Sequence, residues 1–340
     1  MTLSTASQPE GPPPAHSVVY AALDLGTNNC RLLVARPTSG GFRVLDAFSR
    51  IVRLGEGLAR SGCLSDAAMD RSIAALAVCA QKIRSRRVDQ VRAVATEACR
   101  QAANCGHFVE RVRQETGLVI ETIAAAEEAR LVLAGCAPLL DPYAEYALLF
   151  DIGGGSTELL WVRQDRYEPE MLGYASIPLG VVTLADRYGG REVTRGLYAA
   201  MQAEASAHLE TFDAEHGIAE TMAEGGVQML GSSGTVTTLA GVHLELPRYN
   251  RAQVDGIVLD CDAVAGASAR LLDLDYAGRV AHPCIGPERA DLVLAGCAIL
   301  SAILERWPTR RLRVADRGVR EGILYGLMAR NGRRGRGRHP

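Results

Sequence analysis

One short pattern occurs twice in the chain, with Asp24 in the first copy and Asp151, 127 residues later, in the second. Each copy joins an apolar run to an Asp, a glycine-containing turn and a second apolar run, over residues 22–28 and 149–157. An apolar run that ends in such a turn predicts a buried β-strand leading into a hairpin. A repeat of this kind predicts two related domains, each built around one hairpin.

The rest of the chain alternates between strand and helix patterns, which is typical of an α/β protein. We expect strands at residues 18–23, 31–35, 43–51, 91–95, 119–123, 146–150, 158–162 and 228–230. We expect helices at residues 65–83, 102–116, 126–137, 195–212, 236–242, 263–272, 290–306 and 318–330.

The length of 340 residues is sufficient for two domains. We expect a first domain over residues 18–138, a second over 139–317, and a C-terminal helix over 318–330 that packs back on the first domain. Residues 1–17 are rich in Pro and Ser and are predicted to be a disordered leader. The Arg- and Gly-rich residues 331–340 are predicted to be a disordered basic tail, the alternative being an arm that attracts a polyanion.

Composition excludes several classes of function. The formal net charge is −2, which gives no overall electrostatic reason for binding specific DNA or a membrane surface. Lys82 is the only lysine and has no glycine beside it, so a P-loop is excluded. The nine cysteines form no Cys-x-x-Cys pair, which indicates reduced thiols and argues against zinc. With no signal pattern and no apolar run of about 18 residues, we expect a cytoplasmic protein.

The two hairpins carry the chemistry of a phosphate site. An Asp at the end of a buried strand is costly unless its charge is compensated, and Mg²⁺, which uses one or two carboxylates, is the simplest compensator. Glycine permits a tight turn and exposes backbone N–H groups to an anion. A single copy could equally be an ordinary β-hairpin. Two copies, each with an Asp behind a buried strand, favour a two-sided phosphate clamp.

A third loop has similar features. Gly231, Ser232, Ser233, Gly234 and Thr235 follow a short strand and precede a helix, so their amides would lie at a helix N-terminus, where anions bind. The alternative interpretation is simple capping by one of the serines.

Adjacent carboxylates at Glu127 and Glu128 open another predicted helix. Neighbouring residues on a helix point about 100° apart, so one should face the cleft and the other solvent or Arg130. Spacing alone favours an acidic first turn that complements the helix dipole.

Three arginines could grip phosphate oxygens in a bidentate manner. Arg31 follows the first turn, Arg100 lies at a strand-to-helix junction, and Arg289 precedes a late helix. An ion pair of Arg100 with Glu97 is the alternative, and the other two could be structural.

Taken in order, these motifs resemble the exopolyphosphatase/guanosine pentaphosphate phosphohydrolase (Ppx/GppA) family in its short, two-domain form. The similarity extends over residues 18–330 and is carried by motifs at residues 23–28, 53–58, 95–104, 127–131, 150–158, 231–235, 288–291 and 316–322. It implies an actin/hexokinase-like (ASKHA) α/β fold with duplicated ribonuclease H-like domains and an active site in the cleft between them.

The resemblance also implies roles for individual residues. Glu128 resembles the general base that activates water, while Asp151 and Glu158 resemble residues that hold Mg²⁺, or Mn²⁺, with Asp24 opposite. Substrate phosphates would be bound by the two turns, the third loop and the arginines: Gly26, Thr27, Asn28, Arg31, Arg100, Gly153, Gly154, Gly155, Ser156, Thr157, Gly231, Ser232, Ser233, Gly234, Thr235 and Arg289.

The expected activity is therefore hydrolysis of terminal phosphoanhydride bonds in polyphosphate or guanosine pentaphosphate, by a protein that could be a homodimer. Two alternatives use the same scaffold. One is a sugar kinase or actin-like ATPase, and the other is a non-catalytic sensor of polyphosphate or of guanosine penta- and tetraphosphate.

Overall fold

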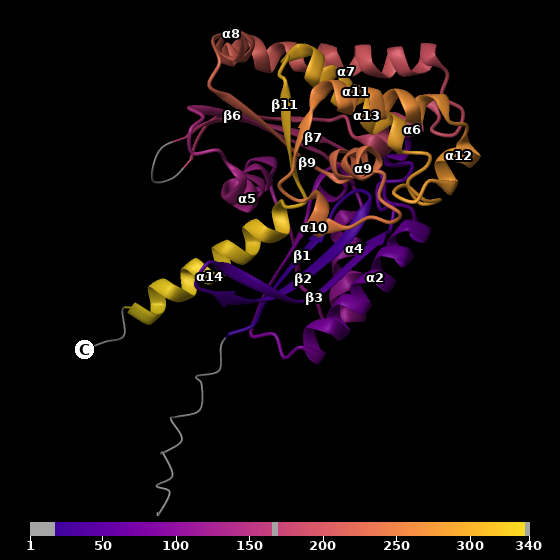
Figure 1. Ribbon diagram of the computed structural model, residues 1–340. Helices are drawn as coiled ribbons and strands as arrows, with labels where there is room; N and C mark the ends of the chain where they lie inside the picture. The colour runs from indigo at the N-terminus through magenta and orange to yellow at the C-terminus, as the bar shows by residue number, and fades with distance from the viewer. Residues whose placement is uncertain (1–17, 165–168, 337–340) are drawn as a thin grey trace, which may run out of the picture.

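The computed structural model describes residues 18–164 and 169–336, which form two lobes, each built around one β-sheet (Figure 1). The leader predicted at residues 1–17 lies outside the described residues, as do residues 337–340 of the predicted tail.

The first lobe contains a five-stranded sheet in the order β3-β2-β1-β4-β5. Its strands are β1 (Tyr20–Leu25), β2 (Asn29–Thr38), β3 (Gly41–Ile51), β4 (Gln90–Ala95) and β5 (Ile120–Thr122). Its helices are α1 (Leu58–Ser61), α2 (Asp66–Ser85), α3 (Glu97–Gln101) and α4 (Cys105–Thr116). The last of these packs on α2.

The second lobe contains a six-stranded sheet in the order β10-β11-β9-β6-β7-β8. Its strands are β6 (Tyr146–Ile152), β7 (Thr157–Arg163), β8 (Glu170–Ile177), β9 (Val227–Ser232), β10 (Val258–Asp260) and β11 (Arg311–Ala315). The helices from residue 125 onward are α5 (Ala125–Cys136), the 3₁₀ helix η1 (Ala137–Leu139), α6 (Val181–Tyr188), α7 (Arg195–His216), α8 (Ile218–Glu224), α9 (Gly234–His243), α10 (Arg251–Val254), α11 (Cys261–Asp273), α12 (Tyr276–Ala281), α13 (Val293–Arg306) and α14 (Val319–Arg336).

The two sheets share a core of four strands, as the internal repeat predicts. The order β3-β2-β1-β4 of the first lobe corresponds to β8-β7-β6-β9 of the second. In both lobes the hairpin strands are antiparallel, and the strand on the other side of β1 or β6 runs parallel to it. The prediction of one hairpin in each of two related lobes is confirmed.

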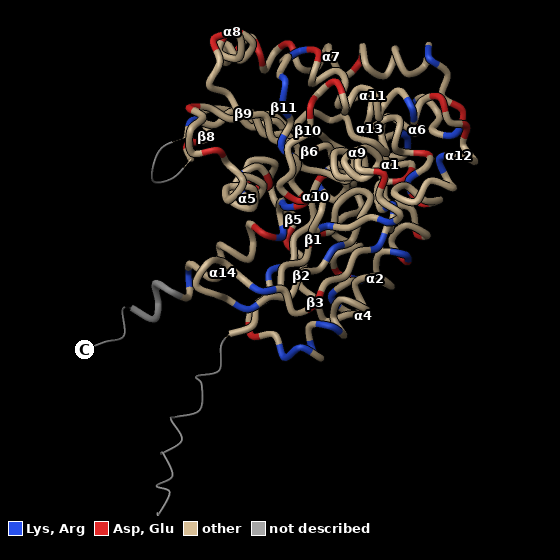
Figure 2. Tube along the Cα trace, in the orientation of Figure 1, with Lys and Arg blue, Asp and Glu red and all other residues tan. Residues whose placement is uncertain are grey.

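Three apolar cores hold this arrangement together. One fills the first lobe around Leu23 and Phe108, and the largest fills the second lobe around Phe150 and Trp307. The third lies between the lobes and combines side chains of both sheets with those of α5 and α14. In Figure 1 the yellow α14 leaves the second lobe and runs alongside the first, where it contacts β1 and α5. Acidic and basic residues are interspersed over both lobes (Figure 2).

For two predicted helices, hydrogen bonds explain why the observed bounds differ. The helix expected at 102–116 begins only at Cys105, after the separate short helix α3, because Ala103 N donates to Gly62 O and Asn104 hydrogen-bonds Leu64 through its side-chain oxygen and nitrogen. The helix expected to end at residue 330 continues to Arg336, so residues 331–336 of the predicted tail are helical. Asn331 anchors this last part through a 2.9 Å hydrogen bond to the Tyr20 hydroxyl.

Candidate functional site

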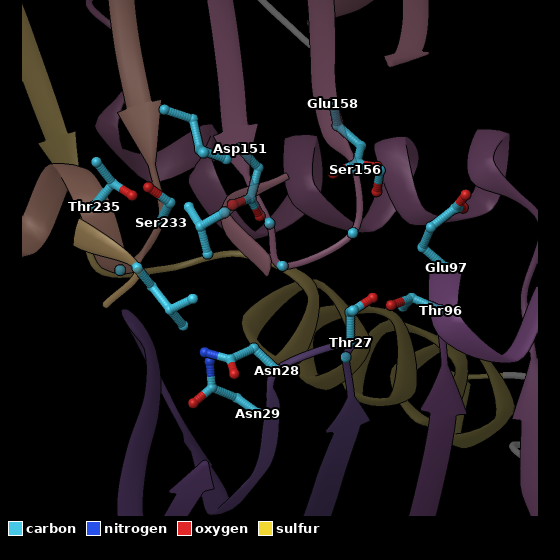
Figure 3. A pocket seen from close by; sticks show the side chains of 18 of the residues that line it. Thr27, Asn28, Asn29, Thr96, Glu97, Asp151, Ser156, Glu158, Ser233 and Thr235 are labelled. Carbon is cyan, nitrogen blue, oxygen red and sulfur yellow. The ribbon is translucent and has the colours of Figure 1, made fainter. Parts of the chain in front are cut away.

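A cavity between the lobes receives the turns of both hairpins (Figure 3). It contains about 950 Å³ of space free of atoms, open solvent included. Asp24 from the first lobe and Asp151 from the second both line it. The two repeat aspartates therefore share one cleft.

Strand register explains why the acidic side chains face this cleft. Asp151 lies at the end of β6, directly opposite Glu158 on β7, and both line the cavity. Asp24 lies at the equivalent place on β1, opposite Arg31 on β2. Because directly opposed residues on paired strands project from the same face of the sheet, each hairpin aims two charged side chains into the cleft.

The two turns lie so close together that two glycines are required. A Cβ at Gly154 would lie 3.0 Å from the Cβ of Asn28, and one at Gly155 would lie 2.7 Å from the Thr27 hydroxyl oxygen. A side chain at Gly155 would force Thr27 or the turn to shift, and one at Gly154 would press against Asn28.

The turns offer unpaired backbone donors to the cleft. One hydrogen bond of 2.9 Å closes each turn, from Gly26 N to Asn29 O and from Gly153 N to Ser156 O. Within the described part of the chain, no acceptor is found for the N–H groups of the two residues between them in each turn: Thr27, Asn28, Gly154 and Gly155. The side-chain oxygens of Asn28 and Asn29 are buried there without a hydrogen-bond partner. Unpaired buried groups of this kind are expected where a polar ligand binds.

Burial dominates the electrostatics of the two aspartates. It raises the pKa of Asp24, while Arg31 opposes the rise. Burial raises the pKa of Asp151 to about 6, again against Arg31, and the negative charge of Asp24 adds to the increase. Among residues 18–164 and 169–336, neither carboxylate accepts a hydrogen bond. Both would be stabilised as anions by a cation in the cleft.

Glu128 is 8% exposed and lines the cavity from the first turn of α5. Arg100 donates from Nη1 to its Oε2 at 2.7 Å. The pKa of Glu128 is raised to about 7, chiefly by burial; Arg100 opposes the rise, and the negative charges of Asp24 and Asp151 add to it. Its neighbour Glu127 points away from the cavity and pairs with Arg92 and Arg130. The predicted divergence of the two carboxylates is confirmed.

Glu158 is held by two hydroxyl groups. Ser156 Oγ donates to its Oε1 at 2.6 Å and Ser176 Oγ to the same atom at 3.1 Å. Burial, with Glu128 and Asp151 nearby, raises the pKa of Glu158 well above its usual range. Glu158 is therefore fixed in orientation beside Asp151.

The three predicted arginines occupy different places. Arg31 and Arg289 line the cavity, and Arg289 donates to the Thr238 hydroxyl at 3.3 Å. Burial and the neighbouring Arg31 lower the pKa of Arg289, so an anion between them would be favoured. Arg100 is not among the lining residues, because it is engaged by Glu97 and Glu128. The ion pair with Glu97, weighed above as the alternative, is present.

The third loop contributes only its later part. Ser233, Gly234 and Thr235 line the cavity at the N-terminus of α9, and Ser233 caps that helix by accepting from Val236 N at 3.2 Å. Three other predicted binding residues make contacts that support the fold. A Cβ at Gly231 would lie 2.6 Å from the Phe150 ring, Ser232 donates to Arg317 O, and Thr157 donates to Leu179 O.

Several lining residues were not among the predicted site residues. Thr96 and Glu97 lie at the same end of the pocket as Ser156 and Glu158, whereas Thr235 lies at the other (Figure 3). Apolar side chains also contribute, from α6, α13 and α14: Val181, Val293 and Val319. Glu97 could have been identified only from its place at a strand-to-helix junction beside Arg100.

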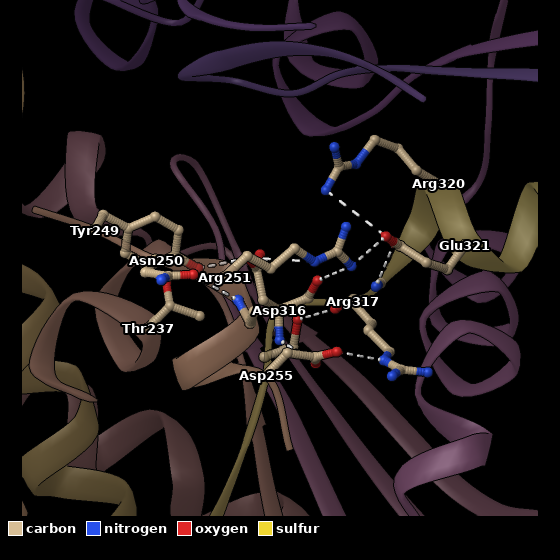
Figure 4. Close-up of polar contacts among 12 residues, drawn as sticks. Thr237, Tyr249, Asn250, Arg251, Asp255, Asp316, Arg317, Arg320 and Glu321 are labelled. Carbon is tan, nitrogen blue, oxygen red and sulfur yellow. Dashed lines mark hydrogen bonds and ion pairs between the residues drawn. The ribbon is translucent and has the colours of Figure 1, made fainter. Parts of the chain in front are cut away.

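A polar network fixes the start of α14 at the base of the cleft (Figure 4). Arg251 donates to the buried Glu321 at 2.9 Å, and Arg317 donates to Asp255 at 2.9 Å. Glu321 in turn accepts from Gly318 N at 3.0 Å. A Cβ built on Gly318 would lie 3.7 Å from Asp151 Oδ2. The motif at residues 316–322 thus places the N-terminus of α14 beside Asp151.

A family model, the Ppx/GppA phosphatase family, matches residues 33–331. A solved exopolyphosphatase-like protein is 26% identical, with a TM-score of 0.84 over 92% of this chain and 98% of that chain. The Ppx/GppA family member of Aquifex aeolicus is 28% identical, with a TM-score of 0.74 over 92% and 98%. An exopolyphosphatase from Cytophaga hutchinsonii is 23% identical, with a TM-score of 0.81 over 92% and 98%, and supports the fold. The expected actin/hexokinase-like α/β fold is confirmed.

None of the helices in the described ranges 18–164 and 169–336 is both long and apolar enough to span a membrane.

Proposed function

Because the chain belongs to the Ppx/GppA phosphatase family and lines one cleft with acids from both lobes, we propose that it hydrolyses terminal phosphoanhydride bonds. It would release orthophosphate from inorganic polyphosphate, convert guanosine pentaphosphate to the tetraphosphate, or do both. The observation that carries the proposal is the meeting of Asp24 and Asp151 in a single cavity that also contains Glu128.

Glu128 is the proposed general base. A pKa of about 7 is suited to accepting a proton near neutral pH, since part of the population is ionised and the protonated form is accessible. A water oxygen would attack the terminal phosphorus while its proton passes to Glu128, and the bond from phosphorus to the bridging oxygen breaks. The bridging oxygen leaves with the shortened chain. Such a base contributes typically 10²–10⁴-fold to the rate.

The turns and arginines would hold the phosphate tail. The unpaired N–H groups of the two turns, together with Ser233, Gly234 and Thr235, would bind terminal phosphate oxygens, since all of these residues line the cavity. Arg31 and Arg289 supply positive charge to the same space. Phosphoryl transfer depends mainly on alignment and on stabilising charge that spreads over the equatorial oxygens, and these groups provide both.

Mg²⁺, with Mn²⁺ as the alternative, is the proposed cofactor, and the residues present fit it. Asp24 and Asp151 are buried carboxylates without hydrogen bonds, and oxygen donors are what these cations prefer. Within the described residues, no three His, Cys, Asp or Glu side chains lie close enough to form a metal cluster, so Asp24, Asp151 and Glu158 are not a direct three-carboxylate cage. One or two of them, with water, would hold the ion, which neutralises phosphate charge when bound.

The proposal is tested by measuring orthophosphate release from polyphosphate and from guanosine pentaphosphate side by side, with and without Mg²⁺. Glu128→Gln should reduce turnover by about 10²–10⁴-fold on either substrate. Glu127→Gln is the matched control, because Glu127 is the adjacent carboxylate that faces Arg92 and Arg130 instead of the cavity. Binding of these anions without Mg²⁺-dependent turnover would instead favour a sensor, and ATP-dependent transfer to an acceptor would favour a kinase.

We further propose a cytoplasmic location and a homodimer. The nine cysteines are free thiols in the structure, which is compatible with a reducing compartment. The dimer rests on the family resemblance.

A further inference from the structure

Arg100 presents two separate edges, and a carboxylate occupies each. From Nη1 it donates to Glu128 Oε2 at 2.7 Å and to Ile123 O at 3.1 Å. From Nε and Nη2 it donates to one oxygen of Glu97, at 2.8 Å and 2.5 Å. The first edge holds the proposed base in place. The second is the edge with which a guanidinium binds phosphate oxygens.

Glu97 lies between Arg100 and the cavity. Glu97 lines the cavity, whereas Arg100 does not. A Cβ at Gly155 would lie 3.3 Å from Glu97 Cγ, so the carboxylate side chain is adjacent to the turn with the free N–H groups. Its other oxygen accepts from Gln101 Nε2 at 2.5 Å, which gives it a second partner on the same helix. An anion held by the second turn would thus meet Glu97 before it met Arg100.

We propose that Glu97 sets the affinity of the site for phosphate, because it occupies the phosphate-binding edge of Arg100 until a substrate phosphate displaces it. The inference rests on the proposed function and concerns the affinity of the same site. A phosphate that takes this edge gains two charge-assisted hydrogen bonds, but the ion pair with Glu97 must first be broken. Glu97 therefore weakens the binding of all anions. The cost is the same for every anion that takes this edge, so it lowers the affinity for orthophosphate and for a longer substrate by the same factor. A substrate with further phosphates on the turns, Arg31 and Arg289 would still bind because it makes more contacts, whereas orthophosphate would be released.

The test is the affinity of orthophosphate and of tripolyphosphate for purified protein, measured by isothermal titration calorimetry in the presence of Mg²⁺. Glu97→Gln keeps the size of the side chain and an acceptor for Gln101 but removes the charge. We expect it to bind orthophosphate more tightly by on the order of tenfold, the size of one charge-assisted hydrogen bond. Product inhibition should strengthen by the same factor. Glu127→Gln, which removes an Arg-paired carboxylate outside the cavity, should leave the affinity unchanged.

A double variant shows whether the effect passes through Arg100. In an Arg100→Met background, Glu97→Gln should give no gain in affinity; a gain of the same size there would mean simple charge repulsion and would overturn the proposal. Unchanged or weaker orthophosphate binding by folded Glu97→Gln would also overturn the proposal, because that result is expected if Glu97 only orients Arg100. Glu97→Ala serves as the second variant if Glu97→Gln does not fold. Because the experiment measures binding, it tests the role of Glu97 even if the protein hydrolyses neither substrate.

Discussion

Replacing Arg100 with Met should shift the pH dependence of catalysis toward alkaline pH. Arg100 is the only hydrogen-bonding cation on Glu128 in the described part of the chain, at 2.7 Å, and it lowers a pKa that burial raises to about 7. A hydrogen bond to a charged group contributes about 1.5–3 kcal/mol, and one pKa unit is about 1.4 kcal/mol. Removing Arg100, whose side chain is 17% exposed, should therefore raise the pKa of Glu128 by about one to two units.

The sign follows from the role of Glu128 as a base. A base must be deprotonated to act, so a higher pKa lowers the active fraction at neutral pH and leaves it intact at alkaline pH. At pH 7 the ionised fraction should fall from about one half to about 1–10%, and kcat should fall about 5- to 50-fold from this cause. Met retains the apolar stem of the side chain, so packing changes little.

The assay is kcat for orthophosphate release between pH 5.5 and 9.5 at fixed Mg²⁺. The acidic limb of the Arg100→Met profile should lie about one to two pH units higher, whatever the height of the alkaline plateau. Arg92→Met is the control, because Arg92 pairs with Glu121 and Glu127 and should leave the limb in place. A uniformly lower profile with an unmoved limb would refute the assignment of Glu128 as the titrating base.

Two further predictions concern contacts between the lobes. Gly155→Ala should lower kcat/KM by about 10²-fold, because its Cβ would lie 2.7 Å from the Thr27 hydroxyl and displace the turns. Gly106→Ala is the control and should have no effect, since a Cβ there has nothing within 4 Å. Normal activity of Gly155→Ala would show that the turns need not meet. Arg53 and Asp291 form a bidentate pair at 2.8 Å and 2.9 Å that joins the lobes, and their side chains are 29% and 20% exposed. A double-mutant cycle on the free energy of unfolding in urea should therefore give a coupling of about 1 kcal/mol. Zero coupling would count against this contact in solution.

The repeated hairpin could be predicted because its signals are local. A buried strand, an Asp and a glycine turn occupy a few consecutive residues, and their period is visible without any knowledge of the fold. Strand β8 was missed because Gly173, which accommodates the His216 ring, interrupts its pattern. Strand β11 was missed because it is only five residues long and carries two arginines.

The partners of the site residues were harder to predict. The pairing of Glu97 with Arg100 is a contact across one helical turn and could be weighed from spacing. The contact of Arg100 with Glu128 joins α3 to α5, and the contact of Arg53 with Asp291 joins residues 238 positions apart. No local sequence pattern could predict either contact. Tertiary packing also decided which residues of the third loop face the cavity, since Gly231 and Ser232 have the same residue types as Gly234 and Ser233.

The central claim is that Asp24 and Asp151, from different lobes, act on one phosphate tail. A double-mutant cycle on kcat tests it most directly, with Asp24→Asn, Asp151→Asn and the double variant assayed for Mg²⁺-dependent orthophosphate release. If both carboxylates serve one site, each single substitution removes most of the activity and the double variant is little worse than either. If instead the two losses multiply, or if one substitution leaves kcat unchanged, the carboxylates act independently and the account is contradicted.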